Sequence, residues 1–270
     1  MSTGNAKDEL NLQEAKLAYE RAIALADFQA GFLARTSHEL RSPLNQIISL
    51  HQLILSDLCD SPEEERAFLT QAQTAIQKVL KNLDLVISIS KLVVGRTHPD
   101  PQPVQVSNLL TRLGALTHMQ AANRSCRLEI VSPDEDLYLY GDPHWLEQAL
   151  VLLVEGAIAS ESRQIKIESQ SPQVETVEIW MTHDGSPKDW QQALASEAPL
   201  PEIEPLANDG LVALSLPFRL QLASQILLAL KGQVNLVNPG SVSEEPAQDN
   251  SSTCLQLVLP SAVDASLADG

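Results

Sequence analysis

Apolar residues recur at spacings of three and four along two stretches within residues 27–95, and each stretch predicts an amphipathic helix. The first stretch carries one predicted seam, made of Leu33, Leu40, Leu44, Ile47, His51 and Ile54. The second begins at a capping residue, Asp60 or Ser61, and continues through Pro62 and an acidic first turn. Its apolar stripe extends to Gly95 and consists of Phe68, Ala72, Ala75, Ile76, Val79, Leu83, Leu85, Val86 and Ile89. A hairpin of two such helices buries little apolar surface alone, so we expect two chains to pair as a four-helix bundle.

The chain on either side of this hairpin also carries readable patterns. Residues 8–32 show a further helical repeat that runs into the first helix, so residues 1–26 are predicted to form a leading helix. Residues 96–104 contain three prolines in nine positions, which predicts a stiff linker. Residues 105–262 then alternate between helical and strand periods. The polar residues 263–270 predict a flexible tail.

The alternation over residues 105–262 predicts a second domain of mixed type. Helices are predicted near 107–121, 142–160 and 211–230. Strands are predicted near 126–131, 136–140, 163–170, 175–182, 233–238 and 254–259, with a variable loop before the last helix. Mixed strands with helices on one side indicate an α/β sandwich. The predicted fold class is therefore a helical-hairpin dimerization domain followed by an α/β sandwich.

Composition narrows the classes of function. The chain carries 18 Lys and Arg against 35 Asp and Glu, a formal net charge of -17, which argues against sequence-independent nucleic-acid binding and disfavours anionic membranes. Cys59, Cys126 and Cys254 are odd in number and far apart, which fits reduced thiols, and no metal-ligand spacing is present. No apolar run is long enough to span a bilayer, and the start of the chain lacks the regions of a signal peptide. We therefore expect a cytoplasmic protein without membrane insertion and without an upstream sensor domain.

One imidazole in the first helical stretch has an informative setting. His38 lies just off the apolar seam beside Glu39, where it can project to the flank of a bundle. A neutral imidazole nitrogen is a competent nucleophile toward phosphorus, and an adjacent carboxylate can orient the ring and stabilise its developing positive charge. Ser42 shares the face of His38 and could position a water for the removal of phosphate. Pro43 has no N–H, so the carbonyl of Glu39 loses its helical hydrogen bond and we expect a bend near His38.

Residues 37–48, SHELRSPLNQII, resemble the phosphoacceptor box of sensor histidine kinases, whose usual form is His, an acidic residue, Leu-Arg, Thr or Ser, and Pro-Leu. The resemblance implies that His38 accepts a phosphoryl group within a dimeric hairpin, with Glu39 and Ser42 assisting it. It also implies a partner, the receiver domain of a response regulator, which Arg41 and Asn45 are candidates to contact. The remaining histidines are expected to be ordinary surface or satisfied residues: His51, His98, His118, His144 and His183.

In the order of its elements, the second domain resembles the catalytic and ATP-binding domain of the same kinases. The residues expected to hold nucleotide there are missing. Where the family has an asparagine that helps ligate magnesium, this chain has Gly156, preceded by Glu155. Where the family has an aspartate that accepts a hydrogen bond from the adenine amino group, this chain has His183, unless the register slips to Asp184. The second glycine of that box falls on Pro187.

The family's last glycine-rich box is also absent. Its final two glycines fall on Pro217 and Arg219, and Gly210 is the only candidate upstream. The chain has 11 glycines in 270 residues, below the average of about 7%, and no two of them are separated by one residue. Backbone amides must approach the phosphates closely in such a loop, so a Gly-x-Gly phosphate loop is excluded. We therefore expect no bound cofactor, with ATP and Mg only if the divergent domain is still active.

Three functions stay open on the sequence. The first is a phosphorelay protein in which His38 exchanges a phosphoryl group with a receiver-domain aspartate, the phosphate coming from another protein such as a separate sensor kinase. The second is an active but divergent cytosolic sensor histidine kinase. The third is a non-catalytic pseudokinase that dimerises and docks a kinase or regulator. The intact pair of His38 and Glu39, followed by Ser42 and Pro43, favours the first.

Overall fold

A computed structural model of the 270-residue chain describes residues 31–133, 137–195, 214–237 and 252–262. The leading helix predicted over residues 1–26 and the tail predicted over residues 263–270 lie outside these ranges. The chain divides into two compact units, and the division falls within the second helix, after Val79. Among the described residues, no helix combines the length and the apolar character that crossing a membrane requires.

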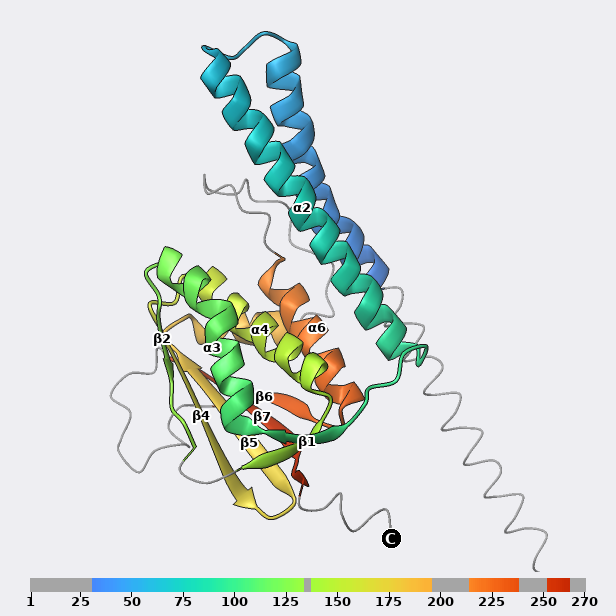
Figure 1. The fold of residues 1–270 in the computed structure, drawn as a ribbon, viewed down its shortest axis with the longest axis vertical. Helices are drawn as coiled ribbons and strands as arrows, with labels where there is room; N and C mark the ends of the chain where they lie inside the picture. Colours follow the sequence, from blue (N-terminus) through green and yellow to red (C-terminus); the bar gives the residue numbers. More distant parts are fainter. Residues whose placement is uncertain (1–30, 134–136, 196–213, 238–251, 263–270) are drawn as a thin grey trace, which may run out of the picture. The chain divides into compact units, whose positions relative to one another are not determined.

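The predicted helical hairpin begins in the first unit, and its second helix continues past the division. The first helix is described over residues 31–55, and α2 extends over Pro62–Val93. Figure 1 shows the two helices antiparallel and side by side, joined by a short turn. The predicted start signal of α2 is confirmed: the Ser61 hydroxyl accepts a hydrogen bond from the Glu64 N–H at 3.2 Å, and the Asp60 N–H donates to the Glu64 carboxylate at 2.6 Å.

The C-terminus of α2 is closed by a glycine. Gly95 has a φ of 72°, in the left-handed region that a residue without a Cβ adopts without steric penalty. The reversal lets the Arg96 N–H donate to the carbonyl of Lys91 at 2.8 Å, which satisfies a carbonyl left free by the end of the helix. The stripe predicted to extend to Gly95 therefore ends in a defined cap.

Within one chain the hairpin covers only part of the predicted seam. Phe32, Pro43 and Leu50 are the buried positions of the first helix, whereas Leu33 is 65% exposed and Leu44 is 47% exposed. A single chain therefore covers the predicted seam only in part, because the apolar residues occupy an arc wider than a single neighbouring helix can cover. His51 is exposed as well, and Leu40, Ile47 and Ile54 are partly buried.

The uncovered apolar residues form a second stripe on each helix. On the first helix the stripe consists of Leu33, Leu44, Ile48 and Leu55. On α2 it consists of Leu69, Ile76, Leu80 and Ile87, of which Ile76 belongs to the predicted apolar stripe. Within each helix these positions are seven, four or eleven residues apart, spacings that keep them on one face. We call these eight residues the exposed apolar stripe.

The second unit is an α/β sandwich, as predicted. Its elements are β1 (Gln102–Gln105), α3 (Val106–Asn123), β2 (Arg127–Ile130), β3 (Tyr138–Gly141), α4 (Pro143–Ala159), β4 (Gln164–Gln173), β5 (Thr176–His183), α5 (Pro187–Ala195), α6 (Leu216–Ala229), β6 (Gln233–Val237) and β7 (Thr253–Pro260). The main sheet has the order β2-β4-β5-β7-β6, with β2 and β4 parallel and the other pairs antiparallel. Helices α3, α4 and α6 lie over one face of this sheet (Figure 1).

The core lies between that face and the three helices. The sheet contributes side chains that are at most 1% exposed, namely Ile165, Ile167, Val177, Ile179, Leu255, Leu257 and Leu259. Helix α4 is buried on most of its circumference, including Leu146, Leu150 and Leu153. Its N-terminus is capped by Asp142, whose carboxylate accepts from the His144 N–H at 2.9 Å, with Pro143 in the first turn. This cap was anticipated by the predicted start of the helix at residues 142–143.

Two elements differ from the prediction. Strand β1 lies within the segment predicted to be a linker, where it pairs with β3 in a separate two-stranded sheet. The Asp100 N–H donates to the Asp142 carboxylate at 2.9 Å, and this hydrogen bond joins the proline-rich segment to the start of α4. Helix α5 occupies the beginning of the predicted variable loop. Its Pro187 at the first position and the spacing of Trp190, Ala193 and Leu194 were signals of a helix.

Candidate functional site

The first helix presents His38 on a face of its own. His38 is partly exposed, and Arg41, Ser42 and Asn45 are exposed. These residues are three, four and seven positions from His38, so helix geometry places all four on one side. Phe32, Pro43 and Leu50, which are buried, lie on the opposite side of the helix. The structure thus brings four of the five predicted site residues together on an accessible face.

The hydroxyl groups next to His38 form hydrogen bonds with backbone carbonyls of the same helix. The Thr36 hydroxyl donates to the carbonyl of Phe32 at 2.7 Å, and the Ser37 hydroxyl donates to the carbonyl of Leu33 at 2.8 Å. The helix continues through Pro43, whose ring is buried. Glu39 is partly buried and lies roughly 100° around the helix from His38, toward the covered side. Its role in orienting the imidazole stays a prediction, as does the bend at Pro43.

A second cluster of polar groups lies in the other unit, where three segments predicted to correspond to a nucleotide site meet. Gly156 of α4 faces α5 and α6: a Cβ placed on it would lie 3.1 Å from Leu216 Cδ1, 3.5 Å from Trp190 Cη2 and 3.8 Å from Arg219 Cδ. At the end of β5, the ring of His183 packs on that of Trp190, with centroids 4.6 Å apart. Trp190 is fully buried.

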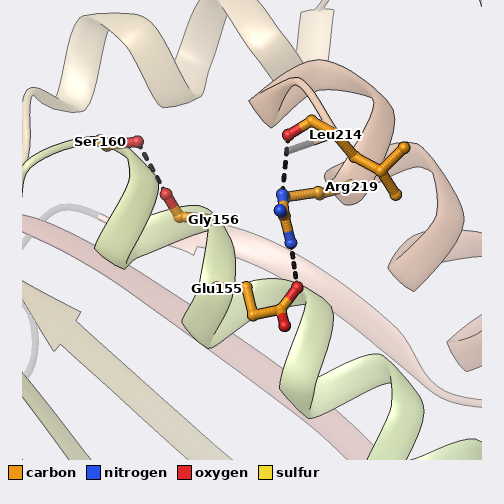
Figure 2. A network of polar contacts seen from close by, with 5 residues as sticks. All are labelled: Glu155, Gly156, Ser160, Leu214 and Arg219. Atoms are coloured by element: carbon orange, nitrogen blue, oxygen red, sulfur yellow. Dashed lines mark hydrogen bonds and ion pairs between the residues drawn. The ribbon is translucent and has the colours of Figure 1, made fainter. Parts of the chain in front are cut away.

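Arg219 is a buried cation with fixed partners. Arg219 is 4% exposed. Its Nε donates to the carbonyl of Leu214 at 2.8 Å, and its Nη1 forms an ion pair with the carboxylate of Glu155. Figure 2 shows the guanidinium held between the carbonyl before α6 and the carboxylate on α4. One turn along α4, the Ser160 hydroxyl donates to the carbonyl of Gly156 at 2.9 Å. The pair therefore ties α4 to α6 at the position of Gly156.

His183 is a buried neutral imidazole. The Gly185 N–H donates to His183 Nδ1 at 3.0 Å, and the Ser162 hydroxyl lies 3.0 Å from the same nitrogen. A backbone N–H can only donate, so Nδ1 is an acceptor and the ring proton sits on Nε2. Burial lowers the pKa of His183 to about 4, and the nearby Asp184 carboxylate opposes this shift.

Asp184 has a structural task. Its carboxylate accepts from the N–H groups of Arg163 and Gln164 at 2.9 Å and 3.1 Å. Those bonds hold the turn between α4 and β4 beside the end of β5. Among the residues that the structure describes, no group of three or more His, Cys, Asp or Glu side chains is placed to hold a metal ion.

Comparison with known proteins assigns the hairpin. Residues 28–93 match the His Kinase A (phospho-acceptor) domain. The sensor histidine kinase GacS of Pseudomonas protegens is 32% identical over 154 residues, which cover 56% of this chain and 16% of GacS. The signal transduction histidine-protein kinase BarA of Escherichia coli is 29% identical over 154 residues, with the same two shares of 56% and 16%.

A solved structure has a similar fold over most of the chain. The Acinetobacter baumannii histidine kinase AdeS aligns with a TM-score of 0.58 at 15% identity, over 83% of this chain and 98% of that chain. The hairpin therefore matches a phospho-acceptor domain, and the chain is similar to sensor histidine kinases. The family resemblance drawn from residues 37–48 is thereby confirmed, as is the arrangement of a helical domain followed by an α/β domain. The chain spans only 16% of GacS and of BarA.

Sequence reasoning missed Trp190 as a residue of interest. The second-domain cluster contains residues that the sequence resemblance assigns to the nucleotide boxes, and Trp190 contacts one of them, His183. The pattern of α5 was the signal that could have found it, since Trp190 stands where the buried face of a short helix is expected. His183 was expected to be an ordinary surface or satisfied residue; it is buried, and its Nδ1 is satisfied.

The buried imidazole predicts a pH dependence of stability. The pKa of His183 is lowered from 6.5 in the unfolded chain to about 4 in the folded chain, so its contribution to stability is complete above pH 6.5 and is lost as the pH falls toward 4. In urea unfolding of the full chain, the stability difference between wild type and His183→Asn should shrink by roughly 2 to 3 kcal/mol between pH 7 and pH 4.5. Asparagine keeps an acceptor near Nδ1 and does not titrate. A constant difference across this range would contradict the buried neutral imidazole.

The ion pair predicts an asymmetric response to mutation. The Arg219 side chain is 5% exposed and that of Glu155 is 22% exposed, so Glu155→Ala strands a buried cation whereas Arg219→Met leaves a carboxylate that water reaches. We expect Glu155→Ala to lower the free energy of unfolding by about 3 to 5 kcal/mol, and Arg219→Met by roughly 1 to 2 kcal/mol. The double variant should be less damaged than Glu155→Ala alone.

Glu147→Ala provides the control on the same helix. Glu147 pairs at 2.7 Å with Arg112, whose side chain is 69% exposed, so its loss should lower the free energy of unfolding by about 1 kcal/mol or less. All four variants can be compared by denaturant unfolding at pH 7. If Glu155→Ala lowers the free energy of unfolding no more than Arg219→Met does, the cost of burying an unpaired guanidinium is not the reason that the two side chains pair.

Proposed function

We propose that this protein is a phosphorelay member of the histidine kinase family in which His38 carries a phosphoryl group exchanged with an aspartate of a response-regulator receiver domain. The observation that supports this most directly is the face of the first helix with His38 flanked by Arg41, Ser42 and Asn45, all accessible. It lies within the stretch that matches the phospho-acceptor domain. A protein partner can approach the side that carries His38, Ser42 and Asn45, because the exposed apolar stripe lies on another side of the helix, with Arg41 between the two.

The exchange needs only the imidazole and a donor of comparable energy. A neutral ring nitrogen of His38 attacks the phosphorus of an aspartyl phosphate, an N–P bond forms, and the acyl–phosphate bond breaks to release the carboxylate. The proton on the other ring nitrogen is then held near Glu39 or passed to water. Arg41 can contribute to docking, because the guanidinium is suited to carboxylates and phosphates. Asn45 offers both a donor and an acceptor one turn further along.

The source of the phosphate is part of the proposal. The places expected to hold magnesium, adenine and the triphosphate carry Gly156 with Glu155, His183, and Pro217 with Arg219. Glu155 and Arg219 bind each other, and the acceptor nitrogen of His183 faces the Gly185 N–H. We therefore propose that phosphate reaches His38 from another phosphorylated protein and that ATP-dependent autophosphorylation is absent.

The functional unit proposed is a homodimer. Eight apolar residues of the hairpin form the exposed apolar stripe, and a soluble helix pair gains free energy by covering such a surface at roughly 25 cal/mol per Å². A second copy would cover it and complete a four-helix bundle. His38 lies away from the stripe, so pairing leaves the imidazole accessible.

Phosphotransfer can be tested directly. A receiver domain labelled through acetyl [32P]phosphate is mixed with the full chain, and the same chain is incubated separately with labelled ATP and magnesium. We expect label on the wild-type chain only in the first mixture, none on His38→Gln, and wild-type labelling of His51→Gln. His51 is the matched control because it is an exposed histidine on the same helix. Label from ATP alone would instead identify an active divergent kinase, and label in neither mixture with any receiver domain would favour a non-catalytic docking protein.

Dimerization can be tested at a residue of the exposed apolar stripe. Ile48 is 52% exposed in a single chain, so a charge there should be tolerated by the hairpin and should oppose its pairing. Multi-angle light scattering should report a dimer for wild type and for Ser49→Glu, and a monomer for Ile48→Glu. Ser49 is exposed and lies on the His38 side of the helix, so it carries the same charge away from the stripe. A dimeric Ile48→Glu protein would show that this stripe is not the interface.

A further inference from the structure

Trp190 lies where three chain segments of the second unit converge. Its indole contacts the position of Gly156 on α4, and its ring packs on that of His183 at the end of β5. The same Gly156 position also faces Leu216 and Arg219 of α6. No part of Trp190 is exposed, and it is among the largest fully buried side chains of the described chain.

Gly156 is the residue that makes room for this arrangement. A glycine in a helix interior is less favourable than alanine by about 1 kcal/mol, so its presence in the middle of α4 needs a reason. A Cβ there would lie 3.1 Å from Leu216 Cδ1, tighter than ordinary contact, and 3.5 Å from Trp190 Cη2. The glycine therefore accommodates the side chains that fill this place.

The groups near the indole that could contact a nucleotide are either paired within the chain or lack the atom needed. The one acceptor nitrogen of His183 receives the Gly185 N–H, and its other ring nitrogen carries a proton, so this side chain cannot accept a bond from an adenine amino group. Arg219 is neutralised by Glu155 and held by the carbonyl of Leu214. Pro217 has no N–H to offer a phosphate.

Two buried N–H donors mark the place as different from an ordinary apolar core. Trp190 Nε1 and His183 Nε2 have no hydrogen-bond partner among the described residues. Cores built for stability alone avoid such groups, because each buried donor without an acceptor is unfavourable. Their occurrence on two rings in contact fits a polar pocket that a large aromatic side chain has come to fill.

We propose that the indole of Trp190 is an internal occupant of the space in which related kinases hold adenine, and that the Arg219–Glu155 pair closes the adjoining phosphate end. The second domain is thus folded around its own side chains in place of nucleotide. This inference deepens the proposed function, because it gives a physical reason for His38 to obtain phosphate elsewhere.

Removing the indole tests the proposal. In the full chain, Trp190→Ala should lower the melting temperature by roughly 10 °C or more, since a large buried ring is lost. Indole added in excess should restore part of that loss, and adenosine should raise the melting temperature of the same variant by a smaller, measurable amount. Wild type should respond to neither compound, nor to Mg-ATP.

Trp180→Ala is the matched control. Trp180 is 8% exposed on β5, and its Nε1 donates to the Glu178 carboxylate at 3.0 Å, so it is a well-buried tryptophan outside the proposed pocket. Its truncation should lower the melting temperature without creating a response to adenosine. A response of Trp190→Ala to indole alone would make Trp190 an ordinary core residue and overturn the proposal, as would a folded Trp190→Ala that responds to neither compound.

A measurement on the intact pocket covers the case in which Trp190→Ala does not fold. Trp145→Phe combined with Trp180→Phe leaves Trp190 as the only tryptophan, because the chain has three. Its fluorescence should be resistant to acrylamide quenching and unchanged by Mg-ATP. An emission change that saturates with Mg-ATP would show that nucleotide enters and would overturn the proposal. Neither readout involves His38, so failure here leaves transfer from a receiver domain standing, and failure of that transfer leaves the occupied pocket standing.

Discussion

A side chain that exchanges a group with another protein has to stay accessible while the helix that carries it is packed on both a neighbour and a partner chain. The first helix meets this constraint through its period. Phe32, Pro43 and Leu50 occupy a buried side of the helix, the exposed apolar stripe occupies a second direction, and His38 with Ser42 and Asn45 occupies a third. A strand has only two faces, so it could not separate three tasks in this way. The packing of the hairpin is what fixes the direction of the imidazole.

The second domain shows the opposite use of burial. A nucleotide site has to keep space open, which small residues and free backbone amides provide. Here the corresponding positions carry Arg219 and Pro217, and the large ring of Trp190 fills the adjoining space. The sandwich still forms, because its sheet and the buried faces of α3, α4 and α6 supply the core independently of any ligand. A fold does not by itself imply a ligand site, so the likeness of fold to AdeS says nothing about nucleotide binding.

Much of the fold and of the accessible face around His38 could be predicted from the sequence, and the features that could not be predicted have physical causes. Helix and strand positions followed from periodicity, and the starts of α2 and α4 followed from Ser61 and from Asp142 with Pro143, because capping chemistry is local. The accessible set around His38 also followed from spacing alone. The division of the apolar arc did not, since Leu33 and Leu44 differ from Leu50 only in which neighbour covers them. Strand β1 was hidden by Pro103 and by the two prolines before the strand, and an edge strand of a two-stranded sheet tolerates a proline.

The roles of Trp190 and Arg219 could not be derived from the sequence because each depends on residues far away along the chain. Arg219 as a lone substitution in α6 would place an unpaired guanidinium in a site that is 5% exposed, which is strongly unfavourable. Glu155 as a lone substitution is tolerable, because water still reaches its side chain, which is 22% exposed. The carboxylate can therefore exist without the guanidinium, but the guanidinium requires the carboxylate. Arg219 and Glu155 are in this sense coupled in one direction, because Glu155 satisfies the requirement that the buried guanidinium of Arg219 creates.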